Sequence, residues 1–298
     1  MATSEPHRPS LSAGLALAMA GSVAFSGKAI IVKLAYRHGV DAVTLIMYRM
    51  LFALPLFVLL AWWASRGKAP LNRRDWINVL CLGFCGYYLA SFLDFAGLQY
   101  ISASLERLIL YLNPTLVLLL GVVFFKKKTT PRALLGMAVS YSGICLVFAH
   151  EVTLVGNNTA LGAALVFGSA VSYAVYLSYS GEVVQRLGAM RLTGLATTVA
   201  CLLCIAQFAA LRPYTALWVA PEVIGLSVLN ATLCTFAPVL MVMLAIERIG
   251  ATRTAQTGMV GPLSTLLMGA LILGEPFTVW IALGTALVLL GIWVFSRS

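Results

Sequence analysis

The chain has 298 residues, of which 61% are hydrophobic and only 10% are charged, and it carries a formal net charge of +10. A soluble domain averages about 45–50% apolar and about 25% charged residues, so this composition excludes a soluble protein and indicates an integral membrane protein. The positive charge does not indicate nucleic-acid binding, because Lys and Arg cluster in short runs between apolar stretches, as in Lys126-Lys127-Lys128. The positive-inside rule explains such runs without any partner.

A membrane-spanning helix needs about 20 mostly apolar residues. The sequence contains ten such runs, joined by connections too short for a soluble domain. The predicted spans cover residues 12–35, 43–64, 75–99, 102–125, 131–149, 160–185, 191–211, 222–246, 251–273 and 277–296. The first run continues past Lys28 and recurs later in the chain, which favours a retained span over a cleaved signal peptide.

The distribution of Lys and Arg among the loops predicts the orientation of these spans. With a cytoplasmic N-terminus, 14 of the 20 Lys and Arg residues lie on the cytoplasmic side and 4 on the outer side, while Lys28 and Arg49 lie within spans. We therefore predict a multi-pass protein of a bacterial inner (plasma) membrane with both termini in the cytoplasm. Residues 1–11 are then a cytoplasmic tail and residues 150–159 a periplasmic connector.

Aligning the sequence with itself at an offset of 148 residues reveals an internal repeat. The aligned pairs include Pro114 with Pro262, Gly136 with Gly284 and Gly143 with Gly291. Each half, 12–149 and 160–298, contains five predicted spans. Because five is odd, the second copy enters the membrane with the opposite polarity to the first. Such inverted repeats are typical of secondary transporters, which place their substrate site near the membrane midplane between the halves.

Two segments of the sequence resemble a known family. Leu273-Gly274-Glu275-Pro276-Phe277-Thr278, followed by Gly284 and Leu290-Gly291-Ile292, resembles the end of an EamA repeat, the hallmark domain of the drug/metabolite transporter superfamily. Tyr48-Arg49-Met50-Leu51-Phe52-Ala53 resembles the Arg-containing second span of that domain. The resemblance covers essentially the whole chain, which is most similar to the bacterial aromatic amino acid exporters.

The two copies depart from each other in two places. Lys126-Lys127-Lys128 stands in the first copy where the second has Gly274-Glu275-Pro276, and Thr197 matches Arg49. The resemblance implies ten helices and export of metabolites, amino acids or amphipathic toxins. It also implies that helices 1, 3, 4, 6, 8 and 9 line the path and that helices 5 and 10 lie outside it.

Polar residues inside a bilayer are costly and are therefore candidates for function. The sixth span carries a polar stripe at helical spacing, which either lines a wet cavity or hydrogen-bonds to neighbouring helices; its members are Ser169, Ser172, Tyr173, Tyr176 and Ser180. The candidate substrate-binding residues are Lys28, Tyr87, Ser91, Asp94, Tyr111, Ser169, Tyr173, Tyr176 and Gln256.

Five charged residues lie in the predicted outer half of the membrane: Lys28, Arg49, Asp94, Glu106 and Arg107. Asp94 is expected to neutralise Lys28, Arg49 or Arg107, because an unpaired charge at that depth costs much free energy. A purely structural ion pair and a role linked to substrate or protons both remain open. We expect Asp94 to stay ionised beside an excess of cations, which leaves positive charge for a substrate carboxylate.

Proline and glycine residues predict the shape of several spans. Pro114 and Pro262 are expected to kink the fourth and ninth helices, because proline lacks the N–H and crowds the preceding turn. The aligned glycines, Gly136, Gly143, Gly284 and Gly291, predict close approach of helices. The six cysteines lie in apolar segments without a completing His, so we predict no metal site.

These observations predict an all-α membrane protein and a secondary transporter that exports small amphipathic metabolites, with amino acids bearing aromatic or apolar side chains as the favoured substrates. The alternative is a proton-coupled multidrug or toxin efflux transporter. An intramembrane enzyme and a non-transporting assembly protein are less well supported. We expect a monomer in the lipid bilayer that requires no cofactor and no ATPase subunit, and its partner is a small-molecule substrate rather than nucleic acid.

Overall fold

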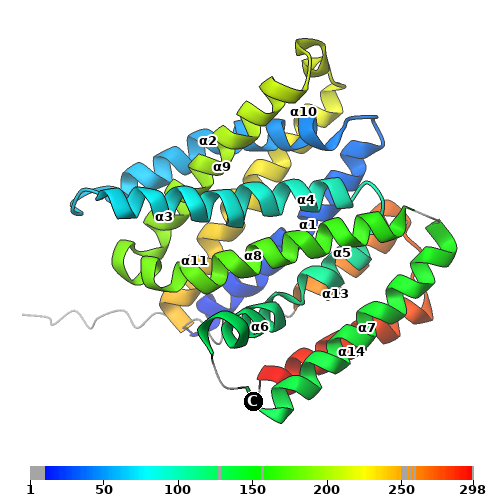
Figure 1. The fold of residues 1–298 in the computed structure, drawn as a ribbon. Coiled ribbons are helices and arrows are strands. Elements are labelled where there is room, and N and C mark those ends of the chain that lie inside the picture. The colour runs from blue at the N-terminus through cyan, green and yellow to red at the C-terminus, as the bar shows by residue number, and fades with distance from the viewer. Residues whose placement is uncertain are drawn as a thin grey trace, which may run out of the picture.

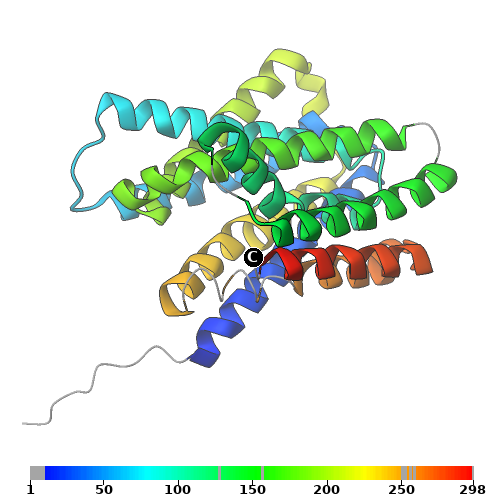
Figure 2. The same ribbon diagram turned by 60° about the horizontal axis from the view of Figure 1, so that its bottom comes forward.

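The computed structural model describes residues 11–126, 129–155, 158–249, 254, 257 and 260–296. In this part of the chain, helical rods run back and forth across the molecule (Figures 1 and 2). We number the rods by the predicted spans, so that one rod can contain several of the labelled helical segments. Eight of them are long and apolar enough to cross a membrane, and Val260–Leu273 and Val279–Val294 are shorter apolar helices. The protein is therefore a multi-pass helical membrane protein. Its exact number of spans and the side on which each terminus lies stay predictions.

The helices in the first half of the chain are α1 (Leu11–Tyr36), α2 (Ala42–Ser65), α3 (Arg73–Gly83), α4 (Ala90–Gly97), α5 (Ala103–Leu110), α6 (Asn113–Phe125) and α7 (Pro131–Val155). Those in the second half are α8 (Thr159–Leu187), α9 (Ala189–Leu211), α10 (Pro221–Ala231), α11 (Ala237–Ile249), α13 (Val260–Met268) and α14 (Val279–Ser296). A short 3-10 turn, η2, covers Tyr214–Leu217.

Most helix boundaries fall within two residues of the predicted spans, because polar caps and glycines interrupt the apolar runs there. Asp41 caps α2 by accepting hydrogen bonds from Val43 N and Thr44 N, and Gly188, with φ of +86°, separates α8 from α9. The fifth rod differs from its prediction. Helix α7 continues to Val155, well into the predicted connector 150–159, because no glycine or proline follows Gly143 until Gly156.

Within the described residues, three rods contain a π-helical segment: η1 (Phe84–Leu89) between α3 and α4, η3 (Thr232–Phe236) between α10 and α11, and η4 (Gly269–Leu273) after α13. The first two are equivalent, because an offset of 148 residues carries Phe84 onto Thr232. A π-helical turn holds one more residue than an α-helical turn and occurs frequently at functional sites. The third and eighth rods are therefore distorted at the same level.

The two predicted proline distortions take different forms. The fourth rod is broken: α5 ends at Leu110, and Pro114 is the second residue of the separate helix α6. Proline suits that position because a first-turn N–H has no partner within the helix. Pro262 lies in α13, and the hydroxyls of Ser26 and Thr265 donate to the carbonyl of Gly261 before it.

Helix pairing shows how the halves are related. Helix α1 packs against α11, α4 against α8, α2 against α9 and α7 against α14. In the repeat, α1 corresponds to α8 and α11 corresponds to α4, so exchanging the halves turns the pair α1–α11 into the pair α8–α4. The other two pairs, α2–α9 and α7–α14, are each made of two equivalent helices. This is the pattern that a twofold axis between the halves produces. The first rods of the halves, α1 and α8, run in opposite directions (Figure 1), so the repeat is inverted.

The predicted glycine contacts join α7 to α14, which lie side by side in both views (Figures 1 and 2). A Cβ atom on Gly143 would lie 2.6 Å from the carbonyl oxygen of Gly284, and one on Gly291 would lie 2.5 Å from that of Gly136. No side chain fits at these positions without movement of the backbones. The prediction of close packing through the four glycines is confirmed.

Candidate functional site

A cavity of about 410 Å³ lies between the two halves. Residues of α1, α2, α4, α5, α8, α9, α11 and α13 line it, together with residues of η1 and η3, so both repeats contribute. Helices α7 and α14 contribute no residue to the described lining, as the family resemblance implies for the fifth and tenth helices. Rods two and seven, which the resemblance did not implicate, contribute Arg49 and Thr197.

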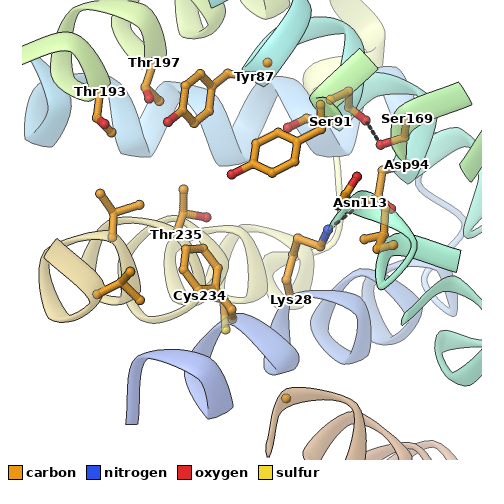
Figure 3. A pocket seen from close by; sticks show the side chains of 18 of the residues that line it. Lys28, Tyr87, Ser91, Asp94, Asn113, Ser169, Thr193, Thr197, Cys234 and Thr235 are labelled. Carbon is orange, nitrogen blue, oxygen red and sulfur yellow. Dashed lines mark hydrogen bonds and ion pairs between the residues drawn. The ribbon is translucent and has the colours of Figure 1, made fainter. Parts of the chain in front are cut away.

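A charged cluster forms one side of the cavity. Lys28 Nζ lies 2.5 Å from Asp94 Oδ2 and 3.3 Å from Glu106 Oε1 (Figure 3 shows the first pair). Both acids are almost completely buried, with side chains 3% and 0% exposed. The sequence predicted that Asp94 neutralises one of three candidate cations, and in the structure this cation is Lys28. Glu106 shares the same ammonium group.

Arg107 belongs to the same side of the cavity but binds differently. Its Nε donates to Thr265 Oγ1 at 3.0 Å and its Nη2 donates to the carbonyl oxygen of Phe25 at 2.9 Å. These contacts join α5 to α13 and α1. The guanidinium group therefore ties three helices of the two repeats together beside the cavity.

Arg49 lies on α2 with an exposed fraction of 7%. Its Nε donates to Thr235 Oγ1 at 3.0 Å, and its guanidinium carbon lies 5.1 Å from the centre of the Phe95 ring. Thr235 in turn donates to the carbonyl oxygen of Asn230 across the π-helical segment η3. The distortion of the eighth rod therefore positions the residue that orients Arg49.

Hydroxyl groups line another part of the cavity. Tyr87, on η1, lies near Thr193 and Thr197 (Figure 3). Tyr176 stacks on Tyr173, with ring centres 5.5 Å apart, and its hydroxyl lies 3.2 Å from that of Tyr87. These groups are aromatic and uncharged, so the cavity lining combines charged residues with aromatic rings and hydroxyl groups.

The structure brings most of the predicted site residues together. The cavity lining includes Lys28, Tyr87, Ser91, Asp94, Tyr111, Ser169 and Tyr173. Tyr176 is 6% exposed and packs behind Tyr87 and Tyr173. Gln256 lies outside the described residues.

The polar stripe of the sixth span combines the two alternatives that the sequence left open. Ser169 lines the cavity and its hydroxyl donates to the carbonyl oxygen of Ala90 at 2.7 Å (Figure 3). Ser172 donates to the carbonyl oxygen of Cys85 at 2.8 Å. These bonds attach α8 to the third rod, while Tyr173 on the same stripe faces the cavity. One helix face thus serves both packing and lining.

The candidate substrate-binding residues left out several lining residues: Thr193, Thr197 and Thr235, and also Arg49, which the sequence had placed among the charged residues of the spans. A signal for two of them was present in the repeat. The offset of 148 residues matches Arg49 with Thr197 and Tyr87 with Thr235, so the hydrogen-bonded pair Arg49–Thr235 occupies the positions equivalent to the neighbours Thr197 and Tyr87. Applying the repeat to a predicted site residue would have found its partner.

The Gly-Glu-Pro motif closes one end of the bundle, which we call the Arg37 end because Arg37 directly follows the last residue of α1 there. Gly274 adopts the left-handed conformation, with φ of +73°, that ends the ninth rod. Glu275 then accepts hydrogen bonds from Ala103 N at 2.8 Å, Ser104 N at 3.4 Å and Ser104 Oγ at 2.9 Å. The second repeat thereby caps helix α5 of the first.

Other contacts reinforce the Arg37 end. Arg37 donates to the carbonyl oxygen of Leu273 at 2.6 Å, and Arg212 lies 3.1 Å from the Asp41 carboxylate. Burial opposes ionisation of Asp41, but hydrogen bonds from Thr44 and Arg212 outweigh it and lower the pKa of this carboxyl group, which lies just outside the second span. Each of the two interhelical contacts joins one repeat to the other.

The inverted helical repeats and the polar cavity between them define a multi-pass membrane transporter. The model of the EamA-like transporter family matches residues 12–149 and 160–297. The chain belongs to this family.

Similar proteins agree with this assignment. The chain is 30% identical over 276 residues to the uncharacterized transporter YcbK of Bacillus subtilis (strain 168), covering 88% of this chain and 86% of that protein. It is 23% identical over 276 residues to an uncharacterized transporter of Archaeoglobus fulgidus, covering 92% and 94%. A protein of known crystal structure shares the fold with a TM-score of 0.63 at 17% identity, covering 97% of this chain and all of that one.

Proposed function

We propose that the protein is a secondary transporter that exports small amphipathic metabolites, with aromatic and apolar amino acids as its main substrates, by alternating access between its two repeats. It works as a monomer in a bacterial inner membrane with both termini in the cytoplasm. The observation that carries the proposal is the cavity between the inverted halves, whose lining combines cations with tyrosines. Such a site matches a molecule with a carboxylate at one end and an apolar group at the other.

The size of the cavity supports small substrates. A volume of about 410 Å³ lies at the lower end of the range of about 300–1,000 Å³ for small-molecule sites. Tyr87 and Tyr173 offer aromatic surface together with hydroxyl groups, which suits an aromatic or apolar side chain.

The test is uptake of radiolabelled amino acids into proteoliposomes that contain the purified full chain. We expect flux of phenylalanine, tyrosine or leucine above that of empty liposomes. The control is Ser91→Trp, which places a large side chain in the cavity and should abolish flux without lowering the amount of reconstituted protein. Equal flux in protein-containing and empty liposomes for every amino acid would refute this function.

The alternative, proton-coupled efflux, is favoured by one observation. Asp94 and Glu106 share the single ammonium group of Lys28 in a nearly dry environment, and two neighbouring carboxylates readily hold one proton between them. The same proteoliposomes separate the two functions. Under facilitated export, an imposed pH gradient does not drive accumulation of substrate above equilibrium. Accumulation that disappears in Glu106→Gln, while downhill exchange survives, identifies proton coupling.

A further inference from the structure

Among the residues that the structure describes, the charges around the cavity come from one repeat. With the offset of 148 residues, the residues that correspond to the charged set are uncharged: Lys28 matches Tyr176, Arg49 matches Thr197, Asp94 matches Val242, Glu106 matches Thr254 and Arg107 matches Ala255. The cavity is therefore electrically polar even though the fold around it is symmetric. A polar cavity of this kind holds an amphipathic molecule in one orientation.

The three cations of this set, Lys28, Arg49 and Arg107, differ in how many of their N–H groups have a partner in the protein. Lys28 is engaged by two carboxylates, and Arg107 donates to Thr265 and to the carbonyl oxygen of Phe25. Arg49 takes part in none of the ion pairs between described residues. Its Nη1 atom is buried and has no hydrogen-bond partner in the described part of the chain.

A buried guanidinium group with an unused donor is costly unless a partner completes it. Leaving such a donor unsatisfied loses the hydration of that group, and the loss is largest for charged groups. Arg49 lines the cavity, is held by Thr235 and lies over the Phe95 ring, so its orientation is already fixed. A planar guanidinium fork matches a carboxylate, which accepts two parallel hydrogen bonds.

The balance of charge leads to the same partner. Three cations face two acids in the cluster, which leaves one positive charge when all five are ionised. A ligand with a single negative charge neutralises this excess. Because Arg49 is the cation of the three without a carboxylate or carbonyl partner among the described residues, it is the place where that charge binds.

We propose that Arg49 is the anchor for the carboxylate of the transported molecule, and that the substrate class is small monocarboxylates with an apolar or aromatic tail, whether or not they carry an amino group. The carboxylate binds Arg49 and the tail extends toward Tyr87 and Tyr173. This inference rests on the proposed transport function and specifies which chemical group of the substrate the protein recognises, namely the carboxylate. Lys28 is less available for this role, because Asp94 and Glu106 already engage its ammonium group.

The test is calorimetric binding to the purified full chain in detergent, with four probes that share one ring: phenylalanine, 3-phenylpropionate, phenylalaninamide and phenethylamine. The wild type should bind the two carboxylates about tenfold to a hundredfold more tightly than the amide and the amine, as expected for charge-assisted hydrogen bonds. In Arg49→Gln this ratio should fall to within about threefold. The matched control is Arg191→Gln, because Arg191 is also buried but donates to Ser65 and Ala69 outside the cavity.

The ratio of affinities is measured within each variant, so a loss of folded protein does not imitate the expected result. If Arg49→Gln yields no folded protein, Arg49→Lys replaces it. The lysine keeps the positive charge but lacks the planar guanidinium group, so the ratio of affinities should lie between those expected for the wild type and for Arg49→Gln. An unchanged ratio in the Arg49 variant measured, or no preference for carboxylates in the wild type, overturns the proposal. Flux of phenylalanine and of its amide at equal rates contradicts the role of Arg49 but leaves transport standing, whereas selective binding without any flux contradicts transport alone.

Discussion

Replacing Glu275 by Gln should loosen the Arg37 end without unfolding the protein. The Glu275 carboxylate accepts three hydrogen bonds from the first turn of α5, where the partial positive charge of the helix favours an anion. The amide keeps one acceptor oxygen and loses the charge. Because the residue is partly exposed, we expect a loss of about 1–2 kcal/mol, from the low end of the range for hydrogen bonds to charged groups.

This loss concerns a contact between the two repeats. Under the proposed alternating access, the repeats separate at the Arg37 end, and the contact then exists only while that end is closed. Removing about 1–2 kcal/mol from the closed state therefore raises the open population by a factor of about 5–30.

A cysteine of the cavity supplies the assay. Cys234 lines the cavity, and in a variant in which the other five cysteines are replaced it is the sole target of a membrane-impermeant thiol reagent. The reagent is added to the face of the membrane at which Arg37 lies. We expect the rate of modification of Cys234 to rise by about the same factor of 5–30 in Glu275→Gln.

The control is Glu151→Gln. Glu151 accepts hydrogen bonds from the backbone N–H and the hydroxyl of Ser102 at the start of the same helix, but it belongs to α7 of the same repeat. This variant should lower thermal stability and leave the modification rate unchanged. Equal rates in the wild type and in Glu275→Gln, or an equal increase in both variants, would refute the role of Glu275 in closing this end.

Two further predictions concern stability in detergent. Gly284→Val should lower the free energy of unfolding by about 1–3 kcal/mol through overpacking, because its Cβ would lie 2.7 Å from the carbonyl oxygen of Gly143. Thermal unfolding measures this loss. The control is Gly225→Ala, whose new methyl group meets no atom within 4 Å and which should not destabilise the protein. Asp41→Ala should cost about 1 kcal/mol by removing the cap of α2. Because the folded-state pKa of Asp41 is lowered, its contribution is complete above about pH 4 and is lost as the pH falls through the lowered value. The thermal midpoint of the wild type should therefore fall more between pH 6 and pH 3.5 than that of Asp41→Asn, and parallel curves would contradict this.

The sequence predicted the helices well because the signals for them are local. Apolar runs of membrane length end at caps such as Asp41 or at glycines such as Gly188, and both act within a few residues of their own position. The glycine contacts were also predictable, because the repeat placed Gly143 and Gly284 at equivalent positions of two apolar helices.

The site was only partly predictable because its geometry depends on helix rotation. A π-helical turn adds one residue, and one residue rotates the following face of a helix by about 100°. The segment η1 precedes Asp94 and the segment η3 contains Thr235, so a count of 3.6 residues per turn misplaces their side chains. The contacts of Glu275 and Arg49 join residues more than 150 positions apart, and no local pattern indicates them.

The two repeats share a backbone distortion but differ in charge. Both copies carry the π-helical segment at the same register, Phe84–Leu89 and Thr232–Phe236. Among the residues that the structure describes, the charged side chains that line the cavity belong to the first copy. The symmetry of the backbone therefore does not extend to the chemistry of the cavity, whose charge is set by one copy.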